Sequence, residues 1–268
     1  MNLRDLLISK LIEAKIPSPR LEADIIIRNS IPNYPLMSDD EKNVALDFLA
    51  RRLNHEPLDK IIGKKEFYKY EFKVNSDVLS PRPDSEILVE KAIEIICKRD
   101  AKIADLGVGS GCLIISILKE CPNATGVGID ISEKALNIAK TNAELLGVND
   151  RILFLKQTFN DAINLDQKFD VIISNPPYIP VYEIDDLDEE VKSFDPIEAL
   201  VGGDDGLLFY RQIAKTSKSI LQKDGYILLE VGYNQAETVS EIFLAKGFKL
   251  IEIVKDLAQI NRCVILKK

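Results

Sequence analysis

Residues 105–111 read Asp-Leu-Gly-Val-Gly-Ser-Gly, and this stretch predicts a sharp turn between a buried strand and a helix. Residues 101–104 form a short apolar run before it, and the helix-like apolar stretch 113–118 follows it. Alternating glycines let the backbone approach a ligand closely, where a side chain would collide. Such a loop is weak support by itself, because a nicotinamide-dependent enzyme would share it.

An acidic residue follows the glycine-rich stretch at an informative spacing. Asp130 ends the next apolar run, residues 126–129, nineteen positions after Gly111 (130 − 111). At the end of the second strand of a nucleotide-binding βαβ unit, a carboxylate is placed to accept both ribose hydroxyls of a ligand. The alternative is that Asp130, ahead of Ser132, only helps to start the next helix.

A third motif, Asn175-Pro176-Pro177-Tyr178, directly follows the apolar run 171–174. Asn175 offers a side-chain carbonyl, Pro176 offers a backbone carbonyl, and the two prolines make a stiff turn. Tyr178 adds an aromatic face. This set suits a planar nitrogen that needs acceptors for its N–H groups. A plain turn at the end of a strand is the alternative, since Asn-Pro often begins turns.

The three motifs occur in the order expected at the carboxyl ends of strands one, two and four of an open parallel sheet. The chain is therefore predicted to have an α/β fold. A dehydrogenase would share the first two motifs but has no use for a rigid amide clamp. The combination favours transfer of a methyl group from S-adenosylmethionine to an amide or an exocyclic amine.

The amino-acid composition narrows the possible functions further. The 268 residues are 46% hydrophobic and carry a net charge of −8, the wrong sign for a protein held to nucleic acid mainly through phosphates. A basic cluster near the predicted domain junction is compatible with an acidic protein surface or phosphate, although a solvated face is the commoner case. It consists of Lys60, Lys64, Lys65 and Lys69.

Histidine and cysteine usage argues against two other classes. The one histidine, His55, lies among polar residues and is expected at the surface near a helix end, which disfavours hydrolase triads and zinc sites. Cysteines at 97, 112, 121 and 263 show no paired spacing, so we expect reduced core residues and no metal site. With no long apolar run and no secretory signal, a cytoplasmic location is predicted.

Two domains are predicted. Residues 1–72 show helical spacing of apolar residues, with Ser18 as a cap before Pro19 and with a capping box formed by Ser38 and Glu41. A β-hairpin is expected from residue 67 to 78, and residues 73–268 form the second domain.

The second domain alternates strands and helices. Helices are predicted at 87–96, 132–146, 206–221 and 235–246, and strands at 152–155, 169–174, 226–230, 250–254 and 263–266. Residues 179–205 are acidic and show no periodicity. A loop of that length beside Tyr178 is predicted to be a lid or a binding loop, with a disordered insertion as the alternative.

These motifs resemble the glutamine N5-methyltransferases of peptide chain release factors, the HemK/PrmC family. The resemblance covers nearly the whole chain, and its more specific parts are the helical domain, Pro81 to Glu86 and Ala199 to Leu207. The remaining matching segments are 56–58, 63, 66–68, 105–111, 175–179, 230–232 and 235.

The resemblance implies a seven-stranded methyltransferase sheet whose last strand is antiparallel, with a helical domain that helps to recognise a release factor. The implied substrate is the glutamine of the Gly-Gly-Gln loop in class I release factors, and the implied cofactor is S-adenosylmethionine. We expect a monomer with no stable nucleic-acid or membrane partner.

Carried over by position, Asn175 Oδ1 and the Pro176 carbonyl would accept the two N–H bonds of the glutamine amide, with Tyr178 stacked on it beside Pro177. The residues implied to surround the cofactor are Gly107, Val108, Gly109, Ser110, Gly111, Asp130, Phe159 and Asn175, with Arg82, Asp84 and Ser85 at the edge of the pocket.

The chain departs from the family pattern at two places. Thr158 stands where an acid usually precedes the aromatic residue at the adenine, and the spacing from Phe159 to Asn175 is one residue longer than usual. Gln259 stands where glycine is usual. The first departure makes the adenine contact the weakest of the implied assignments.

Two other functions are compatible with parts of the pattern. A nucleic-acid adenine or guanine amino-methyltransferase would use the same clamp, but the acidic charge and the helical domain argue against it. A binding or regulatory protein that keeps the fold without turnover is the other, and the presence of both Asn175 and Asp130 disfavours it.

Overall fold

The computed structural model describes residues 2–96, 99–161 and 167–268, and the chain divides into two compact units. The first contains residues 1–64 together with 188–194, and the second contains residues 65–187 together with 195–268. Each unit has its own hydrophobic core. No helix in the described ranges is both long and apolar enough to cross a bilayer.

The first unit is helical. Its principal helices are α1 (Leu3–Glu13), α2 (Pro19–Ser30), α3 (Asp39–Leu53) and α4 (Leu58–Ile62). Leu7, Leu11 and Ile26 are fully buried between α1 and α2, as the helical spacing of apolar residues predicts. His55 is exposed just after α3, as expected.

Both predicted helix starts in this unit are confirmed, since α2 begins at Pro19 directly after Ser18 and α3 begins at Asp39 directly after Ser38. Ser38 Oγ accepts a hydrogen bond from the Glu41 amide, and the Glu41 carboxylate accepts one from the Ser38 amide at 2.7 Å, which is the predicted capping box. Ser18 makes no side-chain capping bond. Its φ of 51° is left-handed rather than extended, so its hydroxyl is not directed at the first amides of α2.

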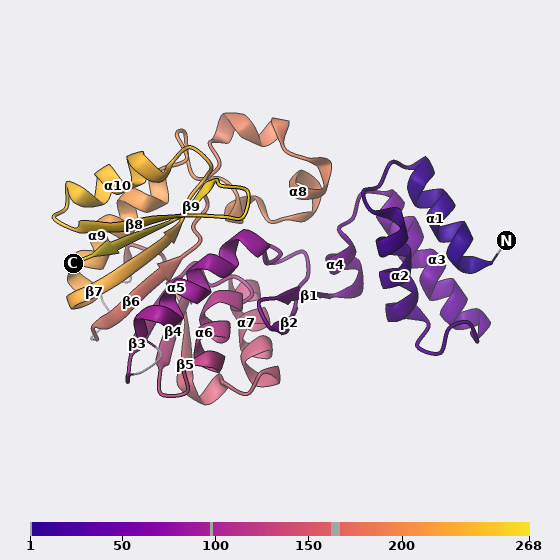
Figure 1. The fold of residues 1–268 in the computed structure, drawn as a ribbon, viewed down its shortest axis with the longest axis horizontal. Helices are drawn as coiled ribbons and strands as arrows, with labels where there is room; N and C mark the ends of the chain where they lie inside the picture. Colours follow the sequence, from indigo (N-terminus) through magenta and orange to yellow (C-terminus); the bar gives the residue numbers. More distant parts are fainter. Residues whose placement is uncertain (1, 97–98, 162–166) are drawn as a thin grey trace. The chain divides into compact units, whose positions relative to one another are not determined.

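The second unit contains the predicted seven-stranded sheet (Figure 1). Its strands are β3 (Lys102–Leu106), β4 (Thr125–Asp130), β5 (Ile152–Lys156), β6 (Phe169–Ser174), β7 (Leu221–Glu230), β8 (Lys249–Lys255) and β9 (Asn261–Lys267). They are arranged in the order β5-β4-β3-β6-β7-β9-β8. The first five pair in parallel, and the last strand of the chain, β9, is antiparallel to both neighbours, as the family resemblance implied.

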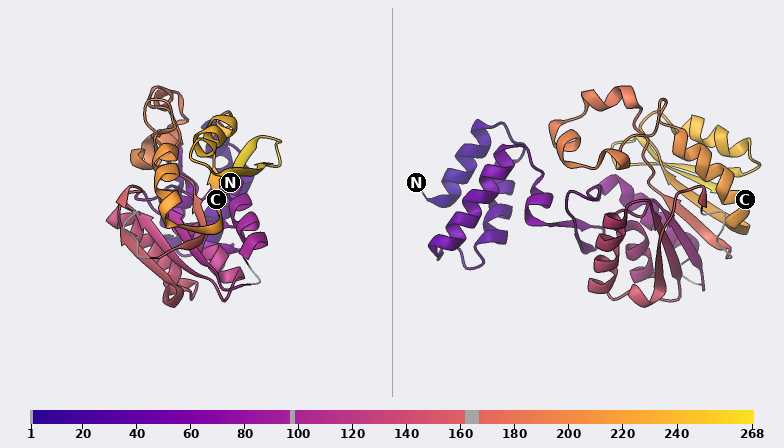
Figure 2. Two further views of the ribbon diagram at one scale, coloured as in Figure 1. Left: turned by 90° about the vertical axis from the view of Figure 1, so that its left-hand side faces the viewer. Right: turned by 180° about the vertical axis from the view of Figure 1, so that it is seen from behind.

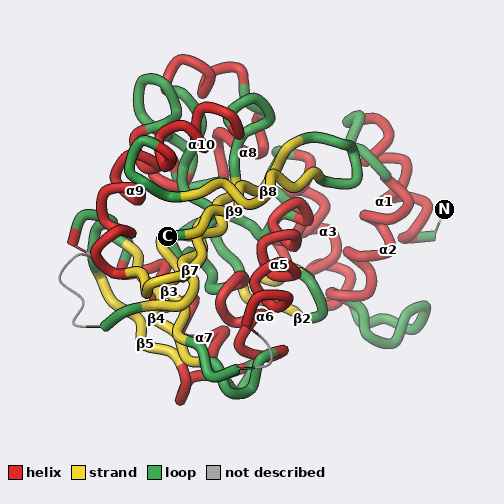
Figure 3. Tube along the Cα trace, turned by 60° about the vertical axis from the view of Figure 1, so that its left-hand side comes forward, coloured by secondary structure: helices red, strands yellow, loops and turns green. Residues whose placement is uncertain are grey.

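Helices cover both faces of this sheet. They are α5 (Glu86–Ile96), α6 (Cys112–Glu120), α7 (Glu133–Leu145), α9 (Leu208–Ile220) and α10 (Ala236–Leu244). Residues of α5, α6 and α7 share one core cluster, and residues of α9 and α10 share another. Figures 2 and 3 show the strands between the two helix layers. Ile103 and Ala104 belong to opposite clusters because successive strand side chains point to opposite faces.

The predicted hairpin is shorter and earlier than expected. It comprises β1 (Lys64–Phe67) and β2 (Tyr70–Lys73), so the strand prediction was wrong for residues 74–78. The apolar alternation continues there for another reason. Val74 and Val78 are buried against Ala135 of α7 rather than paired in a sheet.

The segment between Tyr178 and α9 has more regular structure than the sequence indicated. It forms η4 (Val181–Asp186), α8 (Glu189–Phe194) and η5 (Ile197–Ala199), and Ile179 forms an isolated bridge with Val201. The absence of periodicity was misleading, since helices of three to six residues are too short to display one. A role for this segment as a lid or binding loop stays a prediction.

Three of the four cysteines are described, and Cys112 and Cys263 are free thiols. Cys121 and Cys263 are buried and Cys112 is half-buried, while Cys97 lies outside the described residues.

The expected exposure of the basic cluster was wrong for Lys60. Its side chain is buried, and its ammonium donates to the Phe194 carbonyl at 2.5 Å.

Candidate functional site

Parallel pairing brings the three sequence motifs to one edge of the sheet. Asp105 of β3 lies opposite Gly128 of β4 and Ile173 of β6. The carboxyl ends of these strands therefore lie side by side, and the glycine loop, Asp130 and Asn175 follow directly from them. The Ser174 hydroxyl donates to the Leu106 carbonyl and ties the two strand ends together.

The glycine loop is anchored to β4 and strained for any other residue. The amides of Gly107 and Val108 both donate to the Ile129 carbonyl, at 2.8 and 2.9 Å. Gly107, Gly109 and Gly111 have φ of 81°, 53° and 82°, values that favour glycine. A Cβ on Gly109 would meet no atom within 4 Å. The backbone is thus open to close approach at this residue.

Asp130 lies under this loop. Its Oδ2 accepts from the Gly109 amide at 3.0 Å, and its Oδ1 accepts from the Ser132 amide at 2.9 Å. Burial raises the pKa of Asp130, and these amides oppose the shift. Asp130 does help to start α7, as the alternative reading held. The carboxylate, with about four acceptor positions, nevertheless keeps capacity for another donor.

A second carboxylate at this edge was given no role by the sequence analysis. Asp105 is 1% exposed, and neither of its oxygens has a hydrogen-bond partner among the described residues. Burial raises the pKa of Asp105 well above its usual range, the Ile114 backbone amide opposes the shift, and the nearby charge of Asp130 adds to it. A buried carboxylate without a partner favours a cationic or hydrogen-bond-donating ligand nearby.

Phe159 lies against the glycine loop. Its ring packs edge-on against Phe209, with centroids 5.3 Å apart, and its Cζ would be 3.3 Å from a Cβ on Gly107. The side chain is only 9% exposed. Thr158 stands at the position where an acid is usual in the resembling family, and its hydroxyl donates to Asp161 at 2.8 Å.

The tetrapeptide that begins at Asn175 is held on two sides. Asn175 Nδ2 donates to Ser85 Oγ at 3.3 Å, and the Ser85 hydroxyl donates to a carboxylate oxygen of Glu230. On the other side, Gln235 Nε2 donates to the Tyr178 carbonyl at 2.9 Å, and Gln235 Oε1 accepts from the Gly232 amide at 3.0 Å.

Exposure differs along the tetrapeptide. Pro176 is buried, whereas its three neighbours are half-buried. One proline of the stiff turn is therefore enclosed by the protein, while Asn175, Pro177 and Tyr178 remain partly accessible.

Glu230 is the second buried acid at the site, with 3% exposure. Burial raises the pKa of Glu230 to about 7, and the hydrogen bond from Ser85 and the charge of Arg262 oppose the shift. Burial also raises the pKa of Tyr178, and the neighbouring negative charge of Glu230 adds to this shift. Tyr178 is therefore a neutral aromatic group at physiological pH.

The remaining residues assigned to the edge of the pocket form ion pairs. Arg82 Nη2 lies 2.9 Å from Asp195 Oδ2, and Asp84 lies 3.3 Å from Arg262 Nε. Arg262 also pairs with Asp256 at 3.1 Å. Only Ser85 of the three contacts Asn175 through a described hydrogen bond.

Comparison with known proteins identifies the family. A methyltransferase domain model matches residues 97–262. The chain is 41% identical to the release factor glutamine methyltransferase of Thermodesulfovibrio yellowstonii, over 87% of this chain and 84% of that protein. The chain belongs to the release factor glutamine methyltransferase family.

Other members of the family match the helical unit as well. Identity to the release factor glutamine methyltransferase of Caulobacter vibrioides is 37%, over 96% of this chain and 92% of that protein. A bifunctional methyltransferase of Rickettsia bellii is 38% identical over 95% of this chain, which spans 52% of that protein. The resemblance stated from the motifs is confirmed.

Solved structures confirm the methyltransferase fold. A methyltransferase from Pyrococcus furiosus superposes with a TM-score of 0.56 at 16% identity, covering 83% of this chain and 98% of that one. A ribosomal protein L11 methylase from Lactobacillus delbrueckii superposes with a TM-score of 0.51 at 20% identity, covering 72% and 82%. At such identities the similarity concerns the fold alone.

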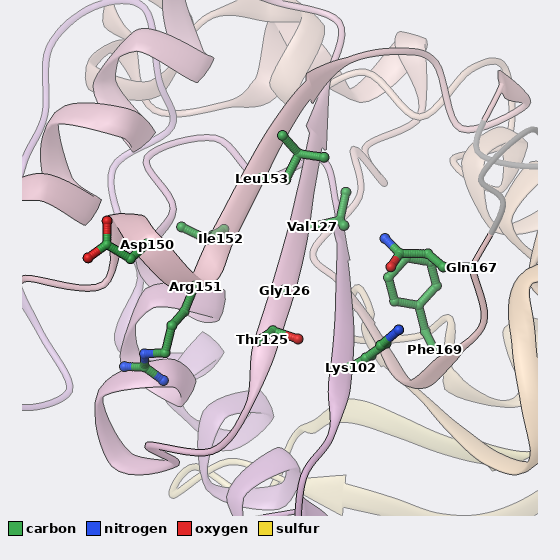
Figure 4. Close-up of a pocket in the computed structure, with 10 residues that line it drawn as sticks. All are labelled: Lys102, Thr125, Gly126, Val127, Asp150, Arg151, Ile152, Leu153, Gln167 and Phe169. Atoms are coloured by element: carbon green, nitrogen blue, oxygen red, sulfur yellow. The ribbon is translucent and has the colours of Figure 1, made fainter.

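In this member of the release factor glutamine methyltransferase family, a surface pocket of about 290 Å³ lies away from the three motifs (Figure 4). It is lined by Lys102, Thr125, Ile152 and Phe169, the first residues of four strands. These mark the amino edge of the sheet, opposite the carboxyl edge. Arg151 there donates to carbonyls at the end of α6, including Leu118 at 2.7 Å, so its role is to cap that helix.

Sequence reasoning gave no role to three site residues of this family member: Asp105, Glu230 and Gln235. A signal for the two acids was present, because each stands in a buried apolar stretch near the carboxyl end of a strand. Gln235 offered no such signal. Its contacts join residues 57 and 3 positions away, and only the fold reveals them.

Proposed function

We propose that this protein transfers a methyl group from S-adenosylmethionine to the side-chain amide nitrogen N5 of a glutamine, the one in the Gly-Gly-Gln loop of class I peptide chain release factors. The observation that carries the proposal is similarity over both units. Relatives named for this reaction match 87% and 96% of the chain at 41% and 37% identity, well beyond the methyltransferase domain alone.

The residues at the carboxyl edge fit the proposed cofactor. Gly107 to Gly111 would wrap its methionine part, Asp130 would accept from its ribose hydroxyls, and Phe159 would lie against its adenine. The open backbone at Gly109 and the remaining acceptor capacity of Asp130 support this placement. When bound, S-adenosylmethionine supplies an electrophilic methyl group on a positively charged sulfur.

Asp105 would add a negative charge beside that cation. Its unpartnered oxygens and its burial support this role. Proximity of a positive charge stabilises the ionised carboxylate, so we expect the pKa of Asp105 to fall when the cofactor binds.

The task of the substrate pocket is orientation. An amide nitrogen is a poor nucleophile, because its lone pair is delocalised into the carbonyl. Asn175 Oδ1 and the Pro176 carbonyl would accept its two N–H bonds and turn the nitrogen toward the methyl group. Such positioning and electrostatic effects each supply several kcal/mol. The amide proton becomes acidic only as the bond forms and leaves late to water.

Tyr178 and Pro177 would form the surface against which the glutamine amide lies flat. Since burial raises the pKa of Tyr178, its ring stays uncharged. We propose that residues 1–72 contribute to recognition of the release factor. The net charge of −8 fits a protein substrate better than a phosphate backbone.

The proposal is tested by incubating the protein with methyl-labelled S-adenosylmethionine and a class I release factor. The factor should become labelled, and replacing its Gly-Gly-Gln glutamine with alanine should abolish the signal. Parallel incubations contain DNA and RNA instead. Equal labelling of a nucleic acid would favour an adenine or guanine amino-methyltransferase, and no labelling of any substrate would favour a protein without turnover.

A further inference from the structure

We propose that Ser85 and Glu230 are positioning residues that fix the direction of the Asn175 amide, so that its carbonyl oxygen, and not its NH2 group, is presented to the substrate. The inference rests on the proposed function and assigns a task to two residues outside the tetrapeptide. It concerns a hydrogen-bond relay that runs from Asn175 through Ser85 to Glu230, beside a direct hydrogen-bonding interaction of the Asn175 side chain with the Glu230 carboxylate.

The relay matters because the two ends of an asparagine amide are nearly equal in size but opposite in hydrogen bonding. The oxygen accepts, and the nitrogen donates two hydrogens. A substrate amide nitrogen also carries donors. If Asn175 turned its NH2 group toward the substrate, donors would face donors and the clamp would repel the group that it must hold.

The direction follows from the chemistry of Glu230. An ionised carboxylate can only accept, so the single proton of the Ser85 hydroxyl is committed to Glu230. The Ser85 oxygen then has only lone pairs left for Asn175 and must accept. It receives Asn175 Nδ2 at 3.3 Å. The other end of the amide, Oδ1, is thereby left for the substrate.

The fold holds the three residues in place. Ser174 and Leu229 are paired across β6 and β7, so Asn175 and Glu230 are the next residues of adjacent strands. Ser85 ends the short helix η1 (Pro83–Ser85) and is 3% exposed, as is Glu230. Because Ser85 and Glu230 are both buried, water does not compete for the hydrogen bond between them.

Protonation of Glu230 would release the constraint. Burial raises the pKa of Glu230 to about 7. Below that pH the neutral carboxyl can donate to Ser85, which frees the Ser85 proton for Asn175 Oδ1 and allows the reverse orientation. The groups that interact with this carboxylate are Ser85, Asn175, Arg262, Asp84, Tyr178, Tyr210, Cys112 and Cys263.

The first experiment compares Ser85→Ala, Ser85→Thr and a control, Ser116→Ala. Ser116 is equally buried, lies on α6, and its hydroxyl has no partner among the described residues. We expect Ser85→Ala to lower kcat on the release factor about tenfold to a hundredfold, with KM and the cofactor Kd little changed. Ser85→Thr keeps the hydroxyl and should restore most of kcat, while Ser116→Ala should leave it unchanged.

The second experiment uses the pH dependence of kcat from pH 5.5 to 8.5. In the wild-type protein kcat should fall as the pH drops through about 7. Glu230→Gln cannot ionise, so its kcat should be lower at pH 8 and should lose this acidic limb. The variant is nearly isosteric, which keeps the test usable if a serine variant folds poorly.

The outcomes separate the relay from the reaction itself. If wild-type protein labels the release factor but Ser85→Ala matches Ser116→Ala in kcat, the relay is wrong and the proposed function stands. An acidic limb retained in Glu230→Gln would also overturn the relay. If wild-type protein labels no release factor, the proposed function fails before the variants are compared.

Discussion

At the carboxyl edge of the sheet, single acidic residues that suit ligand binding reduce the stability of the fold. Asp105 and Glu230 are both almost fully buried, and burial raises the pKa of each. A carboxylate in such a place destabilises the folded state when it is ionised. Their presence near the carboxyl ends of β3 and β7 is better explained by ligand binding and positioning than by packing.

Asn175→Ala tests the clamp directly. Loss of one positioned acceptor should reduce turnover of the release factor by roughly a hundredfold or more, because the nitrogen is no longer aligned. The cofactor Kd should change far less. Rapid-quench kinetics and calorimetry measure the two quantities, with Asn149→Ala as a control at an exposed position of a short 3-10 helix. Comparable losses in turnover and cofactor affinity would assign Asn175 to the structure rather than to the chemistry.

Glu230→Gln should also change the pH dependence of stability. The pKa of Glu230 is about 7 in the folded protein, above its ordinary value of 4.5. Between these values the folded state holds a proton that the unfolded state has released, so this residue's contribution to stability is lost as the pH rises through the window. Relative to wild type, the variant should gain free energy of unfolding from pH 5 to pH 8, by about 3 kcal/mol at most.

Urea unfolding at several pH values measures this change. A difference between variant and wild type that is independent of pH would mean that Glu230 does not titrate in this range.

At the level of elements, the sequence predicted those features that follow from apolar periodicity and from capping residues. The strand β6 was predicted with its observed ends, and the Ser38 capping box was predicted from two residues. Features that depend on tertiary packing, and very short helices, were missed. Val74 and Val78 alternate like a strand because α7 buries them, and α8 is too short to show a period.

The candidate site likewise has features that could be predicted from the sequence and features that could not. Motifs that lie at strand ends could be predicted, because parallel strands bring their carboxyl ends together. The bonds of Ser85 to Asn175 and Glu230 could not, since they join residues 90 and 145 positions apart. Sequence spacing carries no information about such contacts, which depend on how η1 packs beside β6 and β7.

The turn that carries Gly206 offers a test at the element scale. A Cβ there would collide with the Tyr178 carbonyl oxygen and would lie 2.7 Å from Gln235 Nε2, and φ is 72°. Gly147 has a similar φ of 66° but open space around it. Gly147→Ala should therefore lose only about 1 kcal/mol of stability.

Gly206→Ala should lose more stability than this control and should also reduce methyl transfer, because the tetrapeptide shifts. Thermal unfolding and the labelling assay compare the two variants. Equal effects of both substitutions would show that the contact with Tyr178 is unimportant.

At the scale of the whole molecule, the helical unit is assembled from two separate stretches of chain. Residues 188–194 belong to it although they follow Tyr178 in sequence. Arg52 holds this stretch in place. Its side chain is 3% exposed and pairs with Glu22 and Glu190, each at 2.7 Å.

Arg52→Met should therefore destabilise the helical unit by about 3 kcal/mol, the cost of leaving partly buried carboxylates without their partner. Hydrogen exchange should accelerate in residues 188–194. Arg4→Met is the control, because Arg4 and Asp24 form an exposed pair within the same unit and its loss should have little effect. If the two variants unfold alike, Arg52 does not organise this segment.

The discontinuity of the helical unit sets a limit on domain engineering. A chimaera spliced once, after Lys64, would separate Arg52 from Glu190 and Lys60 from the Phe194 carbonyl. A functional exchange with another family member would require both stretches to be transplanted together. Insertions and deletions within 188–194 should then persist in evolution only together with compensating changes around Arg52 and Lys60. We therefore expect these two distant segments to change in a correlated way among relatives.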